Sequence, residues 1–173
     1  MASSGKDSPP SPQSKVVVSV AEEKRGWVEV ALRIRGLKPK AQPSKFFIRM
    51  GKPSDPGPMM DNGELREWSL EPSSLSLRLV VRTAKESKKD REHNAKVMNE
   101  NAENDGETTK TEVFTYKIER FPCDVRTENV KYDVCQPSGR SYAFIMVKME
   151  KVEPQISWQN FQRENGTLDA AML

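Results

Sequence analysis

The residues of this sequence that could carry out chemistry are few and widely separated. The two cysteines, Cys123 and Cys135, have eleven residues between them, and the single histidine, His93, lies in the charged run KKDREHNAK. A structural zinc site needs four ligands in close pairs, which this spacing does not provide. We therefore expect two separate thiols in a reducing compartment, no metal and no cofactor, although the spacing alone leaves a disulfide open.

Catalytic patterns are absent as well. General-base catalysis by histidine would require His93, which we expect to be exposed in a mobile loop without fixed geometry against a serine or cysteine. The sequence has no glycine-rich phosphate loop, no Walker motif and no His-Glu-x-x-His. No acidic pair sits in an apolar frame that would shift its pKa. The sequence therefore predicts a protein that is not an enzyme and has no catalytic residues.

Charge and hydropathy narrow the class of protein further. The 28 basic and 25 acidic residues give a net charge of +3, which argues against a dedicated nucleic-acid binder. The first residues, MASSGKDSPPSPQ, lack the apolar core of a signal peptide, and no stretch approaches the length of a membrane span. We expect a cytoplasmic protein without membrane contact, and leave the nucleus open as a second compartment.

Alternating hydrophobicity predicts the elements that position any site. Apolar and polar residues alternate with a period of two over 27–35, 75–83 and 141–150, which is typical of half-buried strands. Shorter strands are predicted over 15–20, 45–50, 64–70, 112–118 and 129–134, with turn residues between them. Seven to eight strands with hardly any helix predict an all-β fold, an antiparallel β-sandwich.

Composition divides the chain into one domain with polar additions. Residues 1–14 are rich in serine and proline and are predicted to be a disordered tail. The sandwich should occupy 15–160, and 161–173 should form a flexible C-terminal tail. Within the domain, 84–111 is a long polar insertion, predicted to be solvated because it lacks an apolar stripe. It is either a functional feature or an ornament of this lineage, and we favour the second.

The order of the later segments resembles the CS domain. TYKI-ERFPCDV, NVKYDV, FIMVKMEK and ISWQNF follow one another as in that family, and WVEVALRIRG and KFFIRM resemble its first two strands. The family includes co-chaperones of the ninety-kilodalton heat-shock chaperone (the Hsp90 type) and small-heat-shock (Hsp20-like) relatives. Two features differ from the family pattern: Trp27 lies directly against the first alternating strand, and the insertion is longer. The resemblance implies a sandwich that docks on the chaperone or its clients.

Basic residues in the first half of the chain are one group of partner-binding candidates. Arg33, Arg35 and Arg49 could meet an acidic peptide or phosphate groups if they share an outer sheet face. The alternative interpretation is an ordinary solvated face whose charges discourage edge pairing.

Aromatic residues form the second group of candidates. Phe121, Tyr132 and Tyr142 lie at or near turns and could form a docking patch, but the same positions suit closure of the core. Trp158 lies beside the polar tail and could fold onto a partner or act as a lid on one end of the core.

These observations predict a non-catalytic protein-interaction adaptor, associated with a chaperone or a multiprotein assembly. Two alternatives remain: an RNA- or nucleoprotein-associated module that uses the basic face, and a structural subunit of a larger complex.

Overall fold

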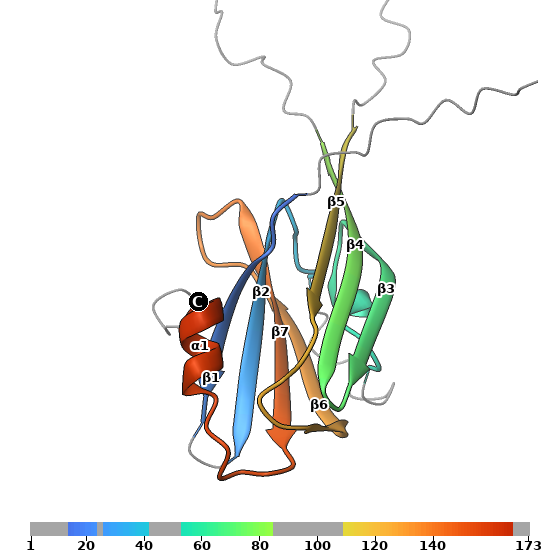
Figure 1. The fold of residues 1–173 in the computed structure, drawn as a ribbon. Helices are drawn as coiled ribbons and strands as arrows, with labels where there is room; N and C mark the ends of the chain where they lie inside the picture. The colour runs from blue at the N-terminus through green and yellow to red at the C-terminus, as the bar shows by residue number, and fades with distance from the viewer. Residues whose placement is uncertain (1–13, 24–25, 42–52, 85–108, 168–173) are drawn as a thin grey trace, which may run out of the picture.

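The computed structural model describes residues 14–23, 26–41, 53–84 and 109–167 of the 173-residue chain. They form two antiparallel sheets that pack face to face, with strand orders β1-β2-β7-β6 and β3-β4-β5 (Figure 1). The strands are β1 (Val17–Glu22), β2 (Trp27–Arg35), β3 (Gly63–Glu71), β4 (Ser74–Ala84), β5 (Thr109–Ile118), β6 (Val125–Cys135) and β7 (Tyr142–Lys151). A short 3-10 helix, η2 (Gly57–Met59), and the helix α1 (Gln159–Asn165) complete the described elements. The predicted antiparallel β-sandwich is confirmed, while the strand predicted over 45–50 lies outside the described residues.

The strand β2 shows why alternation predicted this fold. Its inward side chains are fully buried: Val28, Val30, Leu32 and Ile34. Its outward positions include the exposed Arg33 and Arg35. Pairing with β7 runs from Trp27 opposite Glu150 to Arg35 opposite Tyr142, and this ladder locks the phase of both strands. A slip of one residue would move every inward side chain to the solvent face.

The hairpin of β4 and β5 is longer than its hydrophobic pattern indicated. Its ladder continues until Ala84 pairs with Thr109, so both ends of the insertion predicted over 84–111 belong to strands. Lys110 and Thr111 are exposed there and show no apolar alternation, which is why the sequence pattern placed them in the insertion. Residues 85–108 lie outside the described residues.

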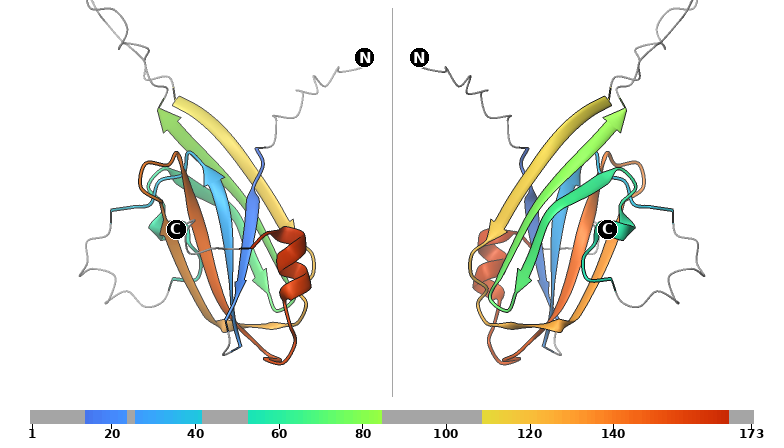
Figure 2. Two further views of the ribbon diagram at one scale, coloured as in Figure 1. Left: turned by 90° about the vertical axis from the view of Figure 1, so that its left-hand side faces the viewer. Right: turned by 90° about the vertical axis from the view of Figure 1, so that its right-hand side faces the viewer.

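Both ends of the domain extend further than the boundaries at 15 and 160. Ser14 pairs with Phe114 of β5, and its N–H donates to the Val113 carbonyl at 3.3 Å. At the other end, α1 lies beside β1 (Figure 2), and Thr167 pairs with Val20 in a parallel bridge. Both segments were predicted to be tails because backbone pairing cannot be detected from the hydropathy of the side chains. Residues 1–13 and 168–173 are outside the described part of the chain.

A buried lysine anchors the connection from β7 to α1. The Nζ atom of Lys151 donates to Glu22 Oε1 at 2.6 Å, to the Ile156 carbonyl at 2.8 Å and to the Pro154 carbonyl at 3.1 Å. The other carboxylate oxygen of Glu22 accepts the backbone N–H of Trp158 at 3.0 Å. The Lys151 side chain is only 2% exposed, so its charge depends on these oxygens for compensation.

We predict that Lys151→Met destabilises the protein strongly. The change leaves a mostly buried carboxylate and two carbonyls without their shared donor, which should cost about 3 kcal/mol of unfolding free energy, the lower end for breaking a buried pair. Urea denaturation measures the loss as a lower midpoint. The matched control is Lys117→Met, whose side chain is 62% exposed and pairs with Glu119 only at 3.9 Å. The control should change the free energy of unfolding by less than about 0.5 kcal/mol. Equal stability of the two variants would contradict the role of Lys151 as an anchor.

The same cluster predicts a specific pH dependence. Burial raises the pKa of Glu22, but the hydrogen bonds from Lys151 and the Trp158 N–H outweigh it, so this pKa lies below its ordinary value of 4.5. A lowered pKa stabilises the fold above the unfolded-state value, and that contribution disappears as the pH falls through the folded-state value. The stability difference between wild type and Glu22→Gln should therefore be largest near pH 7 and shrink on acidification to about pH 3. Urea midpoints across this range test it, and a constant difference would refute it.

Candidate functional site

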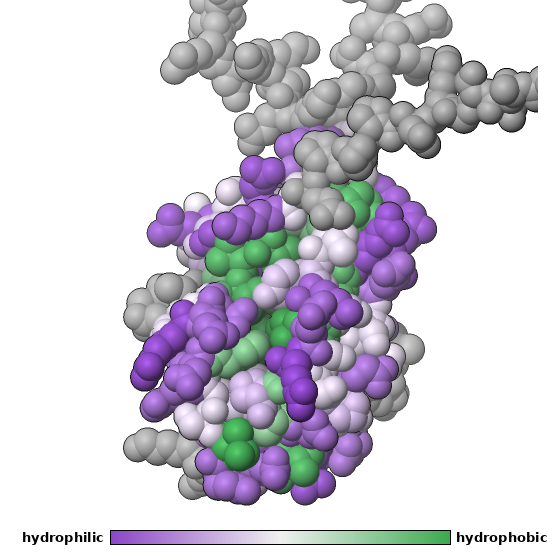
Figure 3. All heavy atoms as spheres, viewed as in Figure 1, coloured by the Kyte–Doolittle hydropathy of each residue, from purple (hydrophilic) through white to green (hydrophobic). Residues whose placement is uncertain are grey.

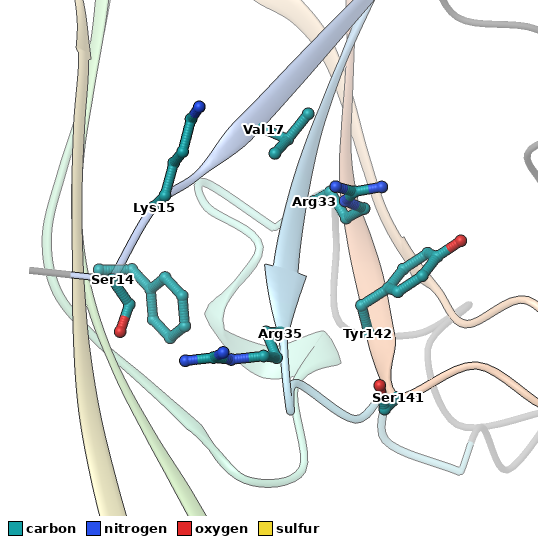
Figure 4. Close-up of a pocket in the computed structure, with 8 residues that line it drawn as sticks. Ser14, Lys15, Val17, Arg33, Arg35, Ser141 and Tyr142 are labelled. Atoms are coloured by element: carbon teal, nitrogen blue, oxygen red, sulfur yellow. The ribbon is translucent and has the colours of Figure 1, made fainter.

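Three of the predicted partner-binding residues, Arg33, Arg35 and Tyr142, meet at one hollow in the surface. This hollow, the basic notch, lies between the start of β1, the end of β2 and the start of β7 and has a volume of about 400 Å³ (Figure 4). Its lining consists of Ser14, Lys15, Val17, Arg33, Arg35, Phe114, Ser141 and Tyr142. The residues come from segments far apart in the sequence, so the fold itself creates the site.

Backbone geometry brings these segments together. Arg35 pairs with Tyr142 at the last step of the β2–β7 ladder, and the chain then turns at Gly36, whose φ is +74°. The Gly36 N–H donates to the Ser141 carbonyl at 2.7 Å, which ties the two strand ends together. A side chain at Gly36 would be strained at this φ, and its Cβ would lie 2.9 Å from Thr83 Cγ2.

Arg33 contacts an aromatic ring. Its guanidinium carbon lies 5.1 Å from the centre of the Tyr142 ring, and this ring meets Phe144 edge-on at 5.5 Å. Such cation–π contact orients the guanidinium while leaving its N–H donors available. Within the described part of the chain, Arg33 has no carboxylate partner, so its charge is free to meet a ligand.

Arg35 has an internal partner. Glu112 Oε1 accepts Arg35 at 2.5 Å, Lys110 at 3.1 Å and the Ser14 hydroxyl at 3.4 Å. Burial raises the pKa of Glu112, but the hydrogen bonds from Lys110 and Arg35 lower it by more, so the carboxyl is ionised near neutral pH. The Arg35 side chain is still 66% exposed, and it can therefore reach a ligand as well.

Positive charge predominates around the notch. The cations are Lys15, Arg33, Arg35 and Lys110, and among the described residues the acid Glu112 contacts two of them, Arg35 and Lys110. On the side of the molecule seen in Figure 3, hydrophilic side chains surround smaller areas of hydrophobic surface. A hollow of this kind suits an anionic ligand with some apolar contact.

The remaining candidates do not join the notch. Tyr132 lies on β6, an edge strand beside β3, where its ring meets Trp68 edge-on at 5.5 Å. Both residues line a second hollow of about 300 Å³. Burial raises the pKa of the Tyr132 hydroxyl, so it stays protonated at neutral pH. Arg49 lies outside the described residues.

Phe121 and Trp158 are core residues, so they have the alternative role that the sequence left open for them, closure of the core. They are 3% and 0% exposed, and their ring centres lie 5.3 Å apart. Phe161 of α1 packs edge-on against Trp158, also at 5.3 Å. The Trp158 indole N–H donates to the Cys123 sulfur at 3.2 Å. These rings close one end of the sandwich.

Sequence reasoning missed the other five lining residues, Ser14, Lys15, Val17, Phe114 and Ser141. Ser14 and Lys15 stand at the predicted boundary between tail and strand, and Phe114 belongs to the other sheet. A lysine directly before an apolar strand was a weak signal for Lys15, but nothing in the sequence marks the pairing of Ser14 with Phe114.

The cysteines are free thiols in separate surroundings, with Cys123 buried and Cys135 half-buried. Burial and the charges of Asp133 and Glu29 raise the pKa of Cys135. Within the described ranges, no group of three His, Cys, Asp or Glu side chains is arranged to hold a metal ion. His93 is outside those ranges. No helix in the described part of the chain has the length and apolar character to cross a lipid bilayer.

Comparison with known proteins adds no family to this description. No protein-family model, curated protein sequence or solved structure matches the chain. The functional inference therefore depends on the basic notch and its surroundings.

Proposed function

We propose that this protein is a non-catalytic interaction module that binds an acidic segment of a partner protein in the basic notch. The observation that carries the proposal is the convergence of Arg33, Arg35 and Tyr142 with Lys15 on one hollow. Arg33 contributes most, because it is pre-oriented by the Tyr142 ring and has no carboxylate partner among the described residues.

The geometry favours a carboxylate-rich peptide for physical reasons. Guanidinium groups present paired N–H donors that match the two oxygens of a carboxylate. Ser14 and Ser141 add hydroxyl groups to the lining, and Val17 and Tyr142 offer apolar contact to the peptide's side chains or backbone. The Arg33 donors need no conformational search, which lowers the entropic cost of binding.

The chemistry of the notch supports binding more than catalysis. Its polar lining consists of cations and hydroxyl groups. The adjacent carboxyl of Glu112 has a lowered pKa and is occupied by Arg35 and Lys110, so it is a poor proton carrier near neutral pH.

The CS resemblance supplies the partner class within this proposal. We propose the ninety-kilodalton heat-shock chaperone or one of its clients as the protein that carries the acidic segment. Titration of the labelled protein with the purified chaperone, with and without nucleotide, tests this part alone. Absence of binding under both conditions would reject the chaperone and leave the acidic-segment proposal to the next experiment.

We predict that Arg33→Glu/Arg35→Glu abolishes binding of a fluorescent peptide rich in Asp and Glu. Each lost charge-assisted contact is worth about 1.5 kcal/mol or more, so the double change should weaken binding by at least about a hundredfold. Fluorescence anisotropy at about 50 and 200 mM salt measures the affinity and its salt dependence.

The matched control is Arg78→Glu/Arg126→Glu, which makes the same change in net charge elsewhere on the surface. These arginines are 53% and 46% exposed and make ion pairs only at 3.8–4.0 Å. The control should bind like wild type. Equal loss in both variants would show a non-specific charge effect. Single-stranded RNA that binds the notch while the peptide does not would instead favour the nucleoprotein alternative.

We further predict that Glu112→Gln strengthens peptide binding. Glutamine removes the charge that competes for Arg35 at 2.5 Å, so the peptide gains a free guanidinium. The gain should be a few-fold, in keeping with about 0.2–1 kcal/mol for an exposed ion pair. Glu67→Gln is the control, since the Glu67 side chain is 70% exposed and its ion-pair partner is Arg78, away from the notch. Both residues belong to the three-stranded sheet. Weaker binding by Glu112→Gln than by the control would mean that Glu112 organises the notch and does not compete with the ligand.

A further inference from the structure

The four-stranded sheet carries a second apolar cluster on the face that points away from the core. This outer apolar cluster consists of Ala31 on β2 and Phe144 and Met146 on β7, which are 0%, 3% and 7% exposed. Tyr142 and Cys135 are the partly buried residues packed against it. The outer face of a two-layer sandwich is ordinarily solvated and polar, so such low exposure indicates a cover.

None of the described helices and strands supplies that cover. The left panel of Figure 2 looks onto this face, and no described element lies across β2 and β7 there. The helix α1 lies to one side, next to β1. Removing large apolar side chains such as those of Phe144 and Met146 from water is favourable, so a segment that covers them stabilises the fold.

The described chain stops beside this same face. Thr167 pairs with Val20 on the free edge of β1, and the Val20 N–H donates to the Gly166 carbonyl at 2.8 Å. The residue before Val20 is Ser19, which is opposite Ala31, and Ala31 is in turn opposite Met146. A straight line across the strands therefore leads from Thr167 to the outer apolar cluster.

The residues that follow Thr167 have a suitable composition and length. Residues 168–173 read LDAAML, five apolar side chains with one aspartate. The distance from the edge position of Thr167 to β7 is three strand spacings, about 14 Å. Six extended residues reach about 20 Å, so the segment is long enough to cross to β7.

We propose that residues 168–173 bind across the outer face of the four-stranded sheet and cover the outer apolar cluster. Their attachment at Thr167 keeps them at a high effective concentration next to the cluster, so they outcompete a separate chain of similar composition. Tyr142 belongs both to the border of the cluster and to the lining of the basic notch. The position of this segment therefore bears directly on the shape of the binding site.

The experiment uses Cys135 as a built-in reporter, because it borders the cluster. The segment's large apolar side chains are replaced together in Leu168→Ser/Met172→Ser/Leu173→Ser, which leaves the net charge unchanged. Alkylation by iodoacetamide, followed by peptide mass mapping, gives the separate rates of Cys135 and Cys123. We expect the Cys135 rate to rise several-fold, while Cys123 stays protected in the core, where it is 7% exposed.

The matched control is Val152→Ser, which replaces an apolar side chain that is already 43% exposed. It should leave the Cys135 rate as in wild type. An unchanged Cys135 rate in the triple variant would overturn the proposal, because the sheet's own side chains would then be the cover. A wild-type rate that falls as protein concentration rises, with no effect of the triple variant, would overturn it in favour of a second copy of the chain.

A rise in the Cys123 rate would show that the triple variant unfolds. In that case the single substitution Met172→Ser decides between the outcomes. Faster alkylation of Cys135 alone supports the proposal, and rates equal to wild type for both cysteines overturn it.

Discussion

The buried ammonium group of Lys151 joins segments that hydrophobic contact alone would not fix in place. It binds the carboxylate at the end of β1 and two carbonyls of the chain that leaves β7, and the same carboxylate accepts the Trp158 N–H. Hydrophobic attraction has no direction, whereas a desolvated charge needs its oxygens at defined positions. The pair therefore determines where the chain passes beneath the sandwich. Trp158 can then close that end of the core, and α1 can run beside β1.

The opposite end of the same sheet is organised differently. There the ends of β2 and β7 are tied by the Gly36–Ser141 hydrogen bond, and Ser14 crosses from the four-stranded sheet to β5. Among the described residues, the basic side chains at this end are exposed and outnumber the acidic side chains that they contact. At the Lys151 end of the sheet, the polar groups thus bind one another. At the notch end, the charged side chains face solvent. The strands β2 and β7 run between these two ends and supply Arg33, Arg35 and Tyr142 to the notch.

Alternation of side chains made the fold predictable, and it also placed Arg33 and Arg35 on one outer face. The same pattern contained an unused signal, because Lys151 continues the inward series of β7 after Val147 and Met149 and is buried with them. The aromatic residues were less predictable. A ring near a turn looks the same in sequence whether it closes a core, as Phe121 does, or borders a surface hollow, as Tyr142 does.

The notch could be predicted only in part for a related reason. The shared face of Arg33 and Arg35 could be predicted from the alternation within one strand. Ser14, Lys15 and Phe114 line the notch because the two sheets contact each other there. Contacts between chain segments about a hundred residues apart are set by packing as a whole. Neither propensity nor periodicity records them, since both describe only neighbouring residues.

The long β4–β5 ladder has a consequence for how this chain can change. Because Ala84 and Thr109 are already paired, the ends of the segment between them are held at the spacing of neighbouring strands whatever that segment contains. Closing a loop costs only about 0.6 kcal/mol more for each doubling of its length. The tip of this hairpin is therefore a permissive insertion point. Evolution or an engineer can lengthen, shorten or replace residues 85–108, or graft a whole foreign domain there, while the sandwich keeps its register.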